Sequence, residues 1–448
     1  MKSSIVIFLS FFCIMSCKKN EEPIVITPDH FHTTIDKVTD VIIHDIFSPP
    51  VASRIYAYPN IAAYEILALK DNGLNPLSGQ LKDLNAIPKP ALDAPVNYEL
   101  SALMTHIELS KRLIFSENKI EIYRDSLYKI WESKNDVVFN SSKKYAAEVT
   151  GHIADWMDKD NYKQTRTMPK FSVFSDEPSR WQPTPPAYMD GIEPHWNKIR
   201  PFVIRTADQF KPIPPPAFSM QEGSDFYKQV KEVYDISQQI TADGDNSEEI
   251  AIAQFWDCNP YVSVTRGHLM FATKKITPGG HWMGITKIAA KKSGFDVSNT
   301  LYAYAKTSVA MADAFISCWD EKYRSNLIRP ETLINDHIDD AWKPILQTPP
   351  FPEYVSGHSV VSGAAAESLT SIFGTNFSFL DDTETPYGLP VREFKSFKAA
   401  AQEAAVSRMY GGIHYRVAVD EGLKQGIALG KYVVTSLQMK NNTQLSFN

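Results

Sequence analysis

The feature of this 448-residue sequence that most restricts its fold is an apolar segment in the C-terminal half, N-T-L-Y-A-Y-A-K-T-S-V-A-M-A-D-A-F-I-S-C-W at residues 299–319. Apolar side chains recur around nearly its whole circumference when it is drawn as a helix. A helix of this kind has no solvent-facing side. We therefore expect a long helix that is central and buried.

Helical periodicity recurs through most of the chain, and we find neither a convincing run of alternating strands nor an internal repeat. Helices are expected at residues 35–47, 55–69, 98–115, 118–131, 142–157, 224–240, 247–256, 283–292, 359–373, 394–409 and 421–437. Pro49 and Pro50 are expected to end the first of these, T-P-G-G-H-W at residues 277–282 to form a turn, and a loop to follow Pro330. Three glycines four residues apart in the last helix, at positions 422, 426 and 430, would let another helix approach closely. The predicted class is all-α.

Residues 170–220 interrupt this pattern with prolines and aromatics. Such prolines forbid long helices, whereas the aromatics argue against disorder. The segment is predicted to be an ordered, irregular crossover between an N-terminal helical region, residues 31–169, and a C-terminal helical region, residues 221–440.

The N-terminus predicts export. Lys2 precedes an apolar run at residues 5–15 that is too short to span a bilayer and has the length of a secretory signal. The run ends in I-M-S-C and then turns polar, which resembles a bacterial lipoprotein signal at residues 1–17, with Cys17 lipidated and residues 18–30 as a tether. A plain secretory signal is the alternative. The lipoprotein reading places the protein on a membrane of the cell envelope, in the periplasm or on the outer surface.

Composition narrows the choice of partners. There are 46 basic and 52 acidic residues, for a net charge of -6, and there is no long basic run. Nucleic acid is therefore not an expected partner. Cys258 and Cys318 could pair in an oxidising compartment, although Cys318 is expected to be a small buried hydrophobe. No later segment has the length of a membrane span, so the body is expected to be soluble.

Three short segments carry the chemistry. In K-Y-R-S-N-L-I-R-P, Lys322 and Arg329 lie seven residues apart and would share one side of a helix. Arginine offers a planar fork of donors suited to an oxyanion. Two surface cations would explain this segment equally well if it stood alone.

The second segment, P-E-Y-V-S-G-H, brings Ser356, Gly357 and His358 to the start of a predicted helix. Glycine lets backbone N–H groups approach a ligand, and a helix start favours negative charge. His358 would then stand beside the anion as a proton donor. A simple serine N-cap is the alternative.

The third segment, S-R-M-Y-G-G-I-H, places Arg408 at a helix end, and its two glycines allow a tight reversal that returns His414 to the same place. A neutral imidazole there could ligate a metal or act as a nucleophile. Taken alone, His414 could equally be an ordinary buried histidine.

Together the three segments resemble the signature of the type 2 phosphatidic acid phosphatase and vanadium haloperoxidase superfamily. That signature reads Lys, six residues, Arg-Pro; Pro-Ser-Gly-His; then Ser-Arg, five residues, His. The chain matches it at Lys322, Arg329, Pro330, Ser356, Gly357, His358, Ser407, Arg408 and His414.

The chain departs from the signature at two positions. Val355 replaces the usual proline, and the turn is expected to survive. Ala418 stands where the family often has the aspartate that orients the final histidine, which leaves Asp420 or a backbone carbonyl as candidates for that task.

Other segments resemble the soluble bacterial haloperoxidase branch, among them R-W-Q-P-T-P-P-A-Y at residues 180–188. In that branch a Trp three residues before the lysine and a Phe seven before the first histidine flank the halide site. Trp319 and Phe351 occupy these offsets, although both could be core aromatics.

The resemblance implies a helical bundle of the vanadium haloperoxidase and acid phosphatase type with vanadate as cofactor. Lys322, Arg329 and Arg408 would neutralise its oxygens, Ser356 and Gly357 would hydrogen-bond to them, and His414 would bind vanadium. His358 would act as acid and base while hydrogen peroxide binds. Halide would then be oxidised, with vanadium acting as a Lewis acid.

The same residues suit a second reaction, hydrolysis of a phosphate ester. There His414 would be the nucleophile that forms a phosphohistidine, and His358 would protonate the leaving group. A third reading is an inactive anion-binding surface lipoprotein, suggested by Val355 and Ala418. Halide preference, organic substrate and oligomeric state stay open, a homodimer included.

Overall fold

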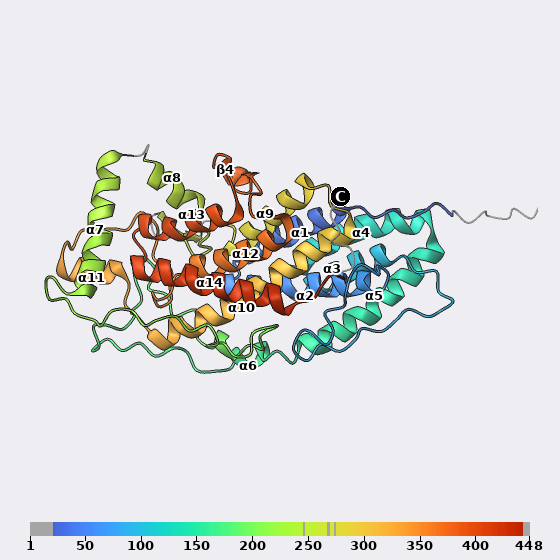
Figure 1. Ribbon diagram of the computed structural model, residues 1–448, viewed down its shortest axis with the longest axis horizontal. Coiled ribbons are helices and arrows are strands. Elements are labelled where there is room, and N and C mark those ends of the chain that lie inside the picture. Colours follow the sequence, from blue (N-terminus) through green and yellow to red (C-terminus); the bar gives the residue numbers. More distant parts are fainter. Residues whose placement is uncertain (1–20, 245–246, 267–268, 273–274, 442–448) are drawn as a thin grey trace, which may run out of the picture.

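The structure is a computed structural model that describes residues 21–244, 247–266, 269–272 and 275–441. The predicted signal segment and its lipidation residue, Cys17, lie outside the described residues. Most of the described chain is helical, and the elements form an elongated bundle (Figure 1).

Helix α10 (Val297–Ser325) runs through the middle of the bundle (Figure 1). Nearly every side chain from Thr300 to Trp319 is buried, as the sequence predicted. Its N-terminus is capped by Asp296, whose carboxylate accepts from the Asn299 N–H at 2.8 Å. The helices that pack on it along its length are α2 (Pro49–Ala68), α9 (Pro278–Lys292), α12 (Gly357–Phe373) and α14 (Arg416–Ser436).

The N-terminal part of the chain supplies α1 (Pro28–His44), α3 (Tyr98–Arg112), α4 (Glu117–Lys134), α5 (Asp136–Met157) and the single turn α6 (Tyr162–Thr165). The expected role of Pro49 and Pro50 was wrong. Helix α1 already ends at His44, and the two prolines form the first turn of α2. Backbone N–H groups have no helical partner in a first turn, so proline costs nothing there.

The C-terminal part supplies α7 (Asp225–Asp243), α8 (Glu248–Phe255), α11 (Pro330–His337) and α13 (Phe397–Tyr410) in addition to α12 and α14. The predicted close helix approach is confirmed between α12 and α14. A Cβ built on Gly426 would lie 2.1 Å from the carbonyl oxygen of Val360, and one on Gly430 would lie 2.9 Å from Ala364 Cα. No residue but glycine fits this crossing.

Between α6 and α7 the chain is irregular apart from one short 3-10 turn, η1 (Trp196–Lys198), as expected for residues 170–220. Trp181 and Trp196 anchor this segment in the interior. The expectation that the chain has no strands needs a small correction, because two short antiparallel strand pairs occur. They are β1 (Ser263–Arg266) with β2 (Leu269–Ala272), and β3 (Phe379–Asp381) with β4 (Arg392–Phe394). They are peripheral additions, and the all-α class is confirmed.

Two further local predictions were wrong. The T-P-G-G-H-W sequence opens α9: the Thr277 hydroxyl caps the helix by accepting from the Gly280 N–H at 3.2 Å. After Pro330 the chain forms α11 where a loop was expected, since Pro330 occupies the first helical position. In both places a proline that reads as a breaker starts a helix.

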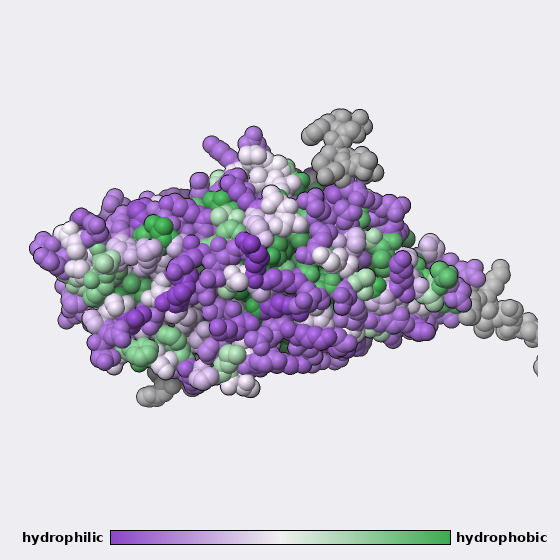
Figure 2. Space-filling view, turned by 60° about the horizontal axis from the view of Figure 1, so that its bottom comes forward, coloured by the Kyte–Doolittle hydropathy of each residue, from purple (hydrophilic) through white to green (hydrophobic). Residues whose placement is uncertain are grey.

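The surface is mainly hydrophilic in the view of Figure 2, with hydrophobic side chains in scattered patches. Within the described residues, no helix is both long and apolar enough to cross a membrane.

Candidate active site

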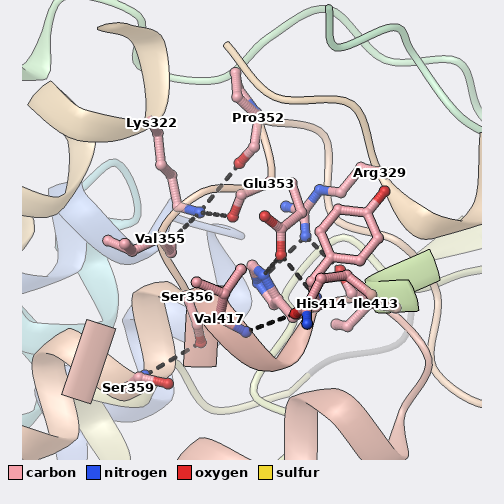
Figure 3. A network of polar contacts seen from close by, with 12 residues as sticks. Lys322, Arg329, Pro352, Glu353, Val355, Ser356, Ser359, Ile413, His414 and Val417 are labelled. Atoms are coloured by element: carbon pink, nitrogen blue, oxygen red, sulfur yellow. Dashed lines mark hydrogen bonds and ion pairs between the residues drawn. The ribbon is translucent and has the colours of Figure 1, made fainter. Parts of the chain in front are cut away.

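The C-terminal end of α10 lies close to the loop that precedes α12. Lys322, in the last turn of α10, is fully buried, and its Nζ donates to the carbonyl oxygens of Pro352 and Glu353, both at 3.1 Å, and of Val355 at 2.6 Å (Figure 3). All three of its protons are thus used to hold this loop. The lysine fixes the backbone that leads into Ser-Gly-His.

Arg329 reaches the same loop by a route that the sequence did not indicate. Helix α10 ends at Ser325, Asn326 adopts a left-handed conformation (φ 47°), and Arg329 is the N-cap residue of α11. Lys322 and Arg329 were expected to share one side of a helix if this segment were helical, and the segment is not one helix. A reversal of the chain brings them together, and Arg329 Nε donates to the carbonyl oxygen of Phe351 at 2.9 Å.

Arg329 also meets the third segment. Its Nη1 donates to the carbonyl oxygen of Ile413 at 2.9 Å and lies 3.2 Å from His414 Nε2. Its Nη2 is buried with no hydrogen-bond partner among the described residues. Nε and Nη1 of this guanidinium are thus hydrogen-bonded within the protein, and Nη2 remains available to a ligand.

His414 is oriented by Glu353. The carboxylate oxygen Oε1 of Glu353 lies 2.7 Å from His414 Nδ1 and accepts the backbone N–H of Tyr415 at 3.0 Å (Figure 3). Because Oε1 is an acceptor in this arrangement, the proton sits on Nδ1 and the lone pair on Nε2. Asp420, which the sequence left as a candidate for this task, is exposed on α14 and was the wrong residue.

Ser356 caps α12, since its hydroxyl accepts the Ser359 N–H at 3.3 Å. The turn therefore survives with Val355 in place of proline. A Cβ built on Gly357 would meet only ordinary contacts, the nearest being Trp319 Cζ3 at 3.5 Å and Lys322 Cε at 3.8 Å. The neighbouring protein atoms therefore do not require glycine at this position.

Arg408 and the two glycines behave as predicted. Arg408 lies in the last turn of α13 with Nη1 donating to the carbonyl oxygen of Trp256 at 3.0 Å, and its Nε is buried without a partner among the described residues. Gly412 has φ 76°, a conformation that favours glycine. This turn reverses the chain and brings His414 back beside Arg408.

Several of these residues border one small cavity. Gly357, His358, Arg408 and His414 line it, whereas Lys322, Arg329 and Ser356 stand behind its wall. The cavity is otherwise apolar and aromatic, and its remaining lining residues are Pro49, Cys258, Asn259, Pro260, Tyr261, Pro278, Phe315, Trp319, Pro349 and Phe351.

The two aromatic residues proposed to flank a halide do lie together. The ring centroids of Trp319 and Phe351 are 5.0 Å apart, and both rings border the cavity. Phe351 also has Lys322 Nζ 5.0 Å and the Arg329 guanidinium carbon 5.1 Å from its ring centroid. The two aromatic rings thus pack against each other, and both cations lie against the ring of Phe351.

Burial disturbs every ionisable group here. It lowers the pKa of Lys322 to about 7 and that of Arg329 to about 10, and it lowers the pKa of Arg408. Burial also raises the pKa of Glu353 to about 7, against the pull of Arg329 and Lys322. An anion in the cavity would compensate the cations that burial penalises.

Both histidines are neutral at neutral pH. Burial is the main cause that holds the pKa of His358 and of His414 well below the usual value, with Arg408 adding to it at His358 and Arg329 adding to it at His414. The Nε2 atom of His358 is buried without a hydrogen-bond partner among the described residues. It is therefore a neutral imidazole with a free nitrogen beside the cavity.

The unpartnered donors fit a tetrahedral oxyanion. Buried polar groups are normally hydrogen-bonded, so each exception calls for an explanation. Arg329 Nη2, Arg408 Nε and His358 Nε2 are three such exceptions around one cavity. A helical bundle whose loops aim these groups at the N-terminus of a buried helix is an oxyanion-binding protein of the haloperoxidase and phosphatase class.

Comparison with known proteins narrows this class. The family model for the VCPO second helical-bundle domain matches residues 335–443. A solved structure described as the first bacterial vanadium-dependent iodoperoxidase is 66% identical to this chain; the match covers 95% of this chain and 100% of that one, with a TM-score of 0.92. The chain belongs to the vanadium-dependent haloperoxidase family.

More distant structures share the fold. The holo form of a bacterial vanadium-dependent chloroperoxidase is 17% identical, with 88% of this chain and 93% of that chain covered and a TM-score of 0.65. Its apo form is 16% identical, with 87% and 94% covered and a TM-score of 0.63. A comparison with curated proteins gave no match. Vanadate is the oxyanion that the family uses, and the unpartnered donors fit it.

The residue that sequence reasoning missed is Glu353. It is the only acidic residue in the P-E-Y-V-S-G-H segment, and its side chain is wholly buried. A buried carboxylate needs a partner. A single acid in an otherwise apolar, proline-rich segment was therefore the available signal.

Proposed function

We propose that this protein is a vanadate-dependent haloperoxidase that uses hydrogen peroxide and takes iodide as its preferred halide. The observation that carries the proposal is a set of buried polar atoms without partners among the described residues: the guanidinium donors Arg329 Nη2 and Arg408 Nε, and the ring nitrogen His358 Nε2. Arg408 and His358 line the cavity together with His414. The preference for iodide rests on the 66% identity with a bacterial iodoperoxidase over nearly the whole chain.

Within this proposal the cofactor is held from three sides. His414 Nε2 carries the lone pair that would bind vanadium, because Nδ1 is committed to Glu353. Arg329 and Arg408 would donate to the cofactor's oxygens through their unused N–H groups. Ser356 and Gly357 would contribute from the N-terminus of α12, and Lys322 would hold the loop and add positive charge.

Bound vanadate supplies a Lewis acid that makes hydrogen peroxide reactive toward halide. His358 would move the protons: its neutral imidazole has a free Nε2 at the cavity, so it accepts a proton from incoming peroxide and returns one when water leaves. Its low pKa keeps it in the form that can accept.

Trp319 and Phe351 would form the halide subsite. A large, weakly hydrated halide such as iodide loses little by leaving water, and the aromatic wall of this cavity offers apolar contact at that small cost. The buried cations behind Phe351 add electrostatic attraction.

The experiment compares three halides and one phosphate ester. The purified protein is incubated with vanadate, hydrogen peroxide and iodide, bromide or chloride, with triiodide formation or halogenation of a dione reporter as the measurement. We expect oxidation that needs vanadate and is fastest with iodide. Cleavage of p-nitrophenyl phosphate that vanadate only inhibits would instead establish the phosphatase reading, since the same donors suit a phosphate.

We also propose that the protein is exported and carried on a membrane by lipid at Cys17. The support is the sequence alone, a short apolar run that ends in I-M-S-C before a polar tether. Metabolic labelling with a fatty acid in the expressing bacterium tests this. The label should appear on the wild-type chain and be absent after Cys17→Ser, and equal labelling of both would contradict the proposal.

A further inference from the structure

A second group of buried polar side chains lies beside the cavity, next to the ring of Trp256. It consists of Cys258, His281 and Glu384, with 1%, 0% and 6% of each residue exposed. Their sulfur, nitrogen and oxygen atoms all lie within 4.8 Å of one another. Three different metal-ligating groups thus converge in the interior, and Cys258 is the one that also lines the cavity described above.

The spacing of these atoms matches a tetrahedral zinc site. His281 Nδ1 lies 3.7 Å from Cys258 Sγ and 3.4 Å from Glu384 Oε1. Zinc bonds of about 2.3 Å to sulfur and about 2.0 to 2.1 Å to nitrogen and oxygen give tetrahedral edges of about 3.6 Å and about 3.3 Å. The two measured edges agree with these values.

The histidine has the support that zinc-binding histidines usually have. His281 Nε2 lies 2.9 Å from Asp381 Oδ2, and the other carboxylate oxygen of Asp381 accepts from Thr383 N at 3.1 Å and Thr383 Oγ1 at 2.6 Å. The indole ring of Trp256 stacks on the imidazole with centroids 4.4 Å apart. A carboxylate on one ring nitrogen leaves the other for a metal and fixes the ring's direction.

The other two groups lie next to the same ring nitrogen of His281, with Cys258 Sγ within hydrogen-bonding distance of Nδ1. Cys258 is a free thiol, not part of a disulfide. Glu384 Oε1 is buried and makes no hydrogen bond of good geometry, its nearest charged neighbour being His281 Nδ1. A buried carboxylate oxygen in this condition is costly unless it is neutralised.

We propose that Cys258, His281 and Glu384 bind a zinc ion, with Asp381 as the partner of the histidine. A thiolate and an imidazole favour zinc over magnesium or calcium, which prefer oxygen ligands. A surface groove is lined by Gly280, Thr383 and Thr385, the sequence neighbours of His281 and Glu384. The site is separate from the vanadate site and does not depend on the proposed halide chemistry.

A metal here would have two effects on the neighbouring cavity. Cys258 lines that cavity, and a thiolate bound to zinc is less exposed to an oxidant made there. The metal would also fix the ring on which Trp256 stacks, and the carbonyl oxygen of Trp256 holds Arg408. The zinc ion would thus help to hold Arg408, one of the residues proposed to bind the oxyanion, in position.

A metal-free arrangement is the competing explanation. A protonated His281 could donate to Asp381 through Nε2 and to Glu384 through Nδ1, with Cys258 as a bystander. The two explanations differ in whether the thiol is needed for binding and whether the protein holds zinc at all.

The test starts from the purified protein after treatment with a chelator. Titration with Co²⁺ is followed by absorption, because a thiolate ligand gives a charge-transfer band in the near-ultraviolet and a tetrahedral site gives strong visible bands. Zinc content is measured by mass spectrometry after equilibration with Zn²⁺. We expect one zinc per chain and both sets of Co²⁺ bands.

Variants identify the ligands. Cys258→Ser should remove the charge-transfer band, and Glu384→Gln should weaken Zn²⁺ binding by a factor of a hundred or more, while Asp381→Asn should weaken it by about 10–100-fold, as expected for the partner of a ligand. Cys318→Ser, a buried thiol in α10, and His414→Ala are the matched controls and should bind as the wild type does. Circular dichroism melting shows whether each variant is folded.

The outcome that overturns the proposal does not depend on any variant. Wild-type protein that retains no zinc after equilibration and shows no thiolate-to-Co²⁺ band has no such site. Equal zinc binding by wild type and folded Cys258→Ser and Glu384→Gln variants would also overturn it, since the metal would then be bound elsewhere.

Discussion

Glu353 Oε1 lies 2.7 Å from His414 Nδ1, although 61 residues separate the two in the sequence. The carboxylate that orients His414, the proposed vanadium ligand, is therefore supplied by the loop before Ser-Gly-His. Ala418, at the position where the family often has an aspartate, is fully buried, and its carbonyl oxygen accepts the N–H of Ser356 at 3.0 Å. In this chain the orienting carboxylate comes from the loop before α12, and the start of α14 contributes a backbone carbonyl oxygen to the same region.

Replacing Glu353 should therefore weaken cofactor binding. We expect Glu353→Gln to lower vanadate affinity by about 10–100-fold, because an amide no longer dictates which nitrogen of His414 carries the proton. Asp420→Asn, which changes an exposed carboxylate on α14, should leave affinity unchanged. Vanadate titration of the cofactor-free protein, followed by the recovery of activity, measures both. A larger loss in Asp420→Asn than in Glu353→Gln would contradict this assignment.

The two histidines should separate binding from proton transfer. His414→Ala should abolish tight retention of vanadate through gel filtration. His358→Ala should retain it but lose about 10²–10⁴-fold in peroxidase rate, the range for loss of a positioned acid–base group. Metal analysis of the filtered protein gives the first result and iodide oxidation the second. Retention by His414→Ala would remove that residue as the vanadium ligand.

The halide subsite should respond to its aromatic wall. Phe351→Leu should raise the KM for iodide several-fold, since it removes one of the two rings 5.0 Å apart at the cavity. Vanadate affinity should change much less, because no cofactor donor is lost. Phe373→Leu, at the far end of α12, is the control for loss of an aromatic ring in general. An unchanged KM for iodide would indicate that Trp319 and Phe351 are core aromatics that do not bind halide.

The α12–α14 crossing should tolerate no side chain at its centre. A Cβ on Gly426 would stand 2.1 Å from Val360 O, so Gly426→Ala must push the two helices apart. Overpacking of this kind destabilises by about 1–3 kcal/mol or more. Gly151→Ala in α5, where a Cβ meets nothing within 4 Å, should be neutral or stabilising by about 0.5–1 kcal/mol. Urea unfolding of the two variants compares them directly.

One buried carboxyl should make stability depend on pH. Glu65 lies in α2 and accepts the Leu77 N–H, and burial raises its pKa from 4.5 to about 7. Since the folded state binds this proton more tightly than the unfolded chain does, its contribution is fully present below pH 4.5 and is lost as pH rises through about 7.

Glu65→Gln carries no charge and keeps an acceptor for Leu77. The difference in unfolding free energy between variant and wild type should therefore grow in favour of the variant as pH rises, by up to about 3 kcal/mol. Urea midpoints at pH values below and above this interval provide the measurement. A difference that stays constant with pH would contradict the raised pKa.

Local periodicity predicted most of the helices correctly. Residues 299–319 could only be a buried helix, because no side of it suits water. The errors occurred at prolines, because a proline can either end a helix or occupy the first turn of one. Pro49, Pro278 and Pro330 were read as breaks or turns, and each lies in the first turn of a helix. Only the cap residue and the following periodicity distinguish these cases.

The sequence by itself determined which groups the site contains, since the three motifs name the cations, the histidines and the Ser-Gly turn with their order and spacing. It did not determine how these groups are divided between binding and support. Lys322 uses its three donors on backbone carbonyls, Arg329 leaves Nη2 without a partner among the described residues, and Glu353 takes the place expected of Asp420. Hydrogen-bond partners distant in the chain are set by how helices pack, and local residue patterns carry no record of that packing. The tertiary structure alone decided those roles, and it alone brought Cys258, His281 and Glu384 together.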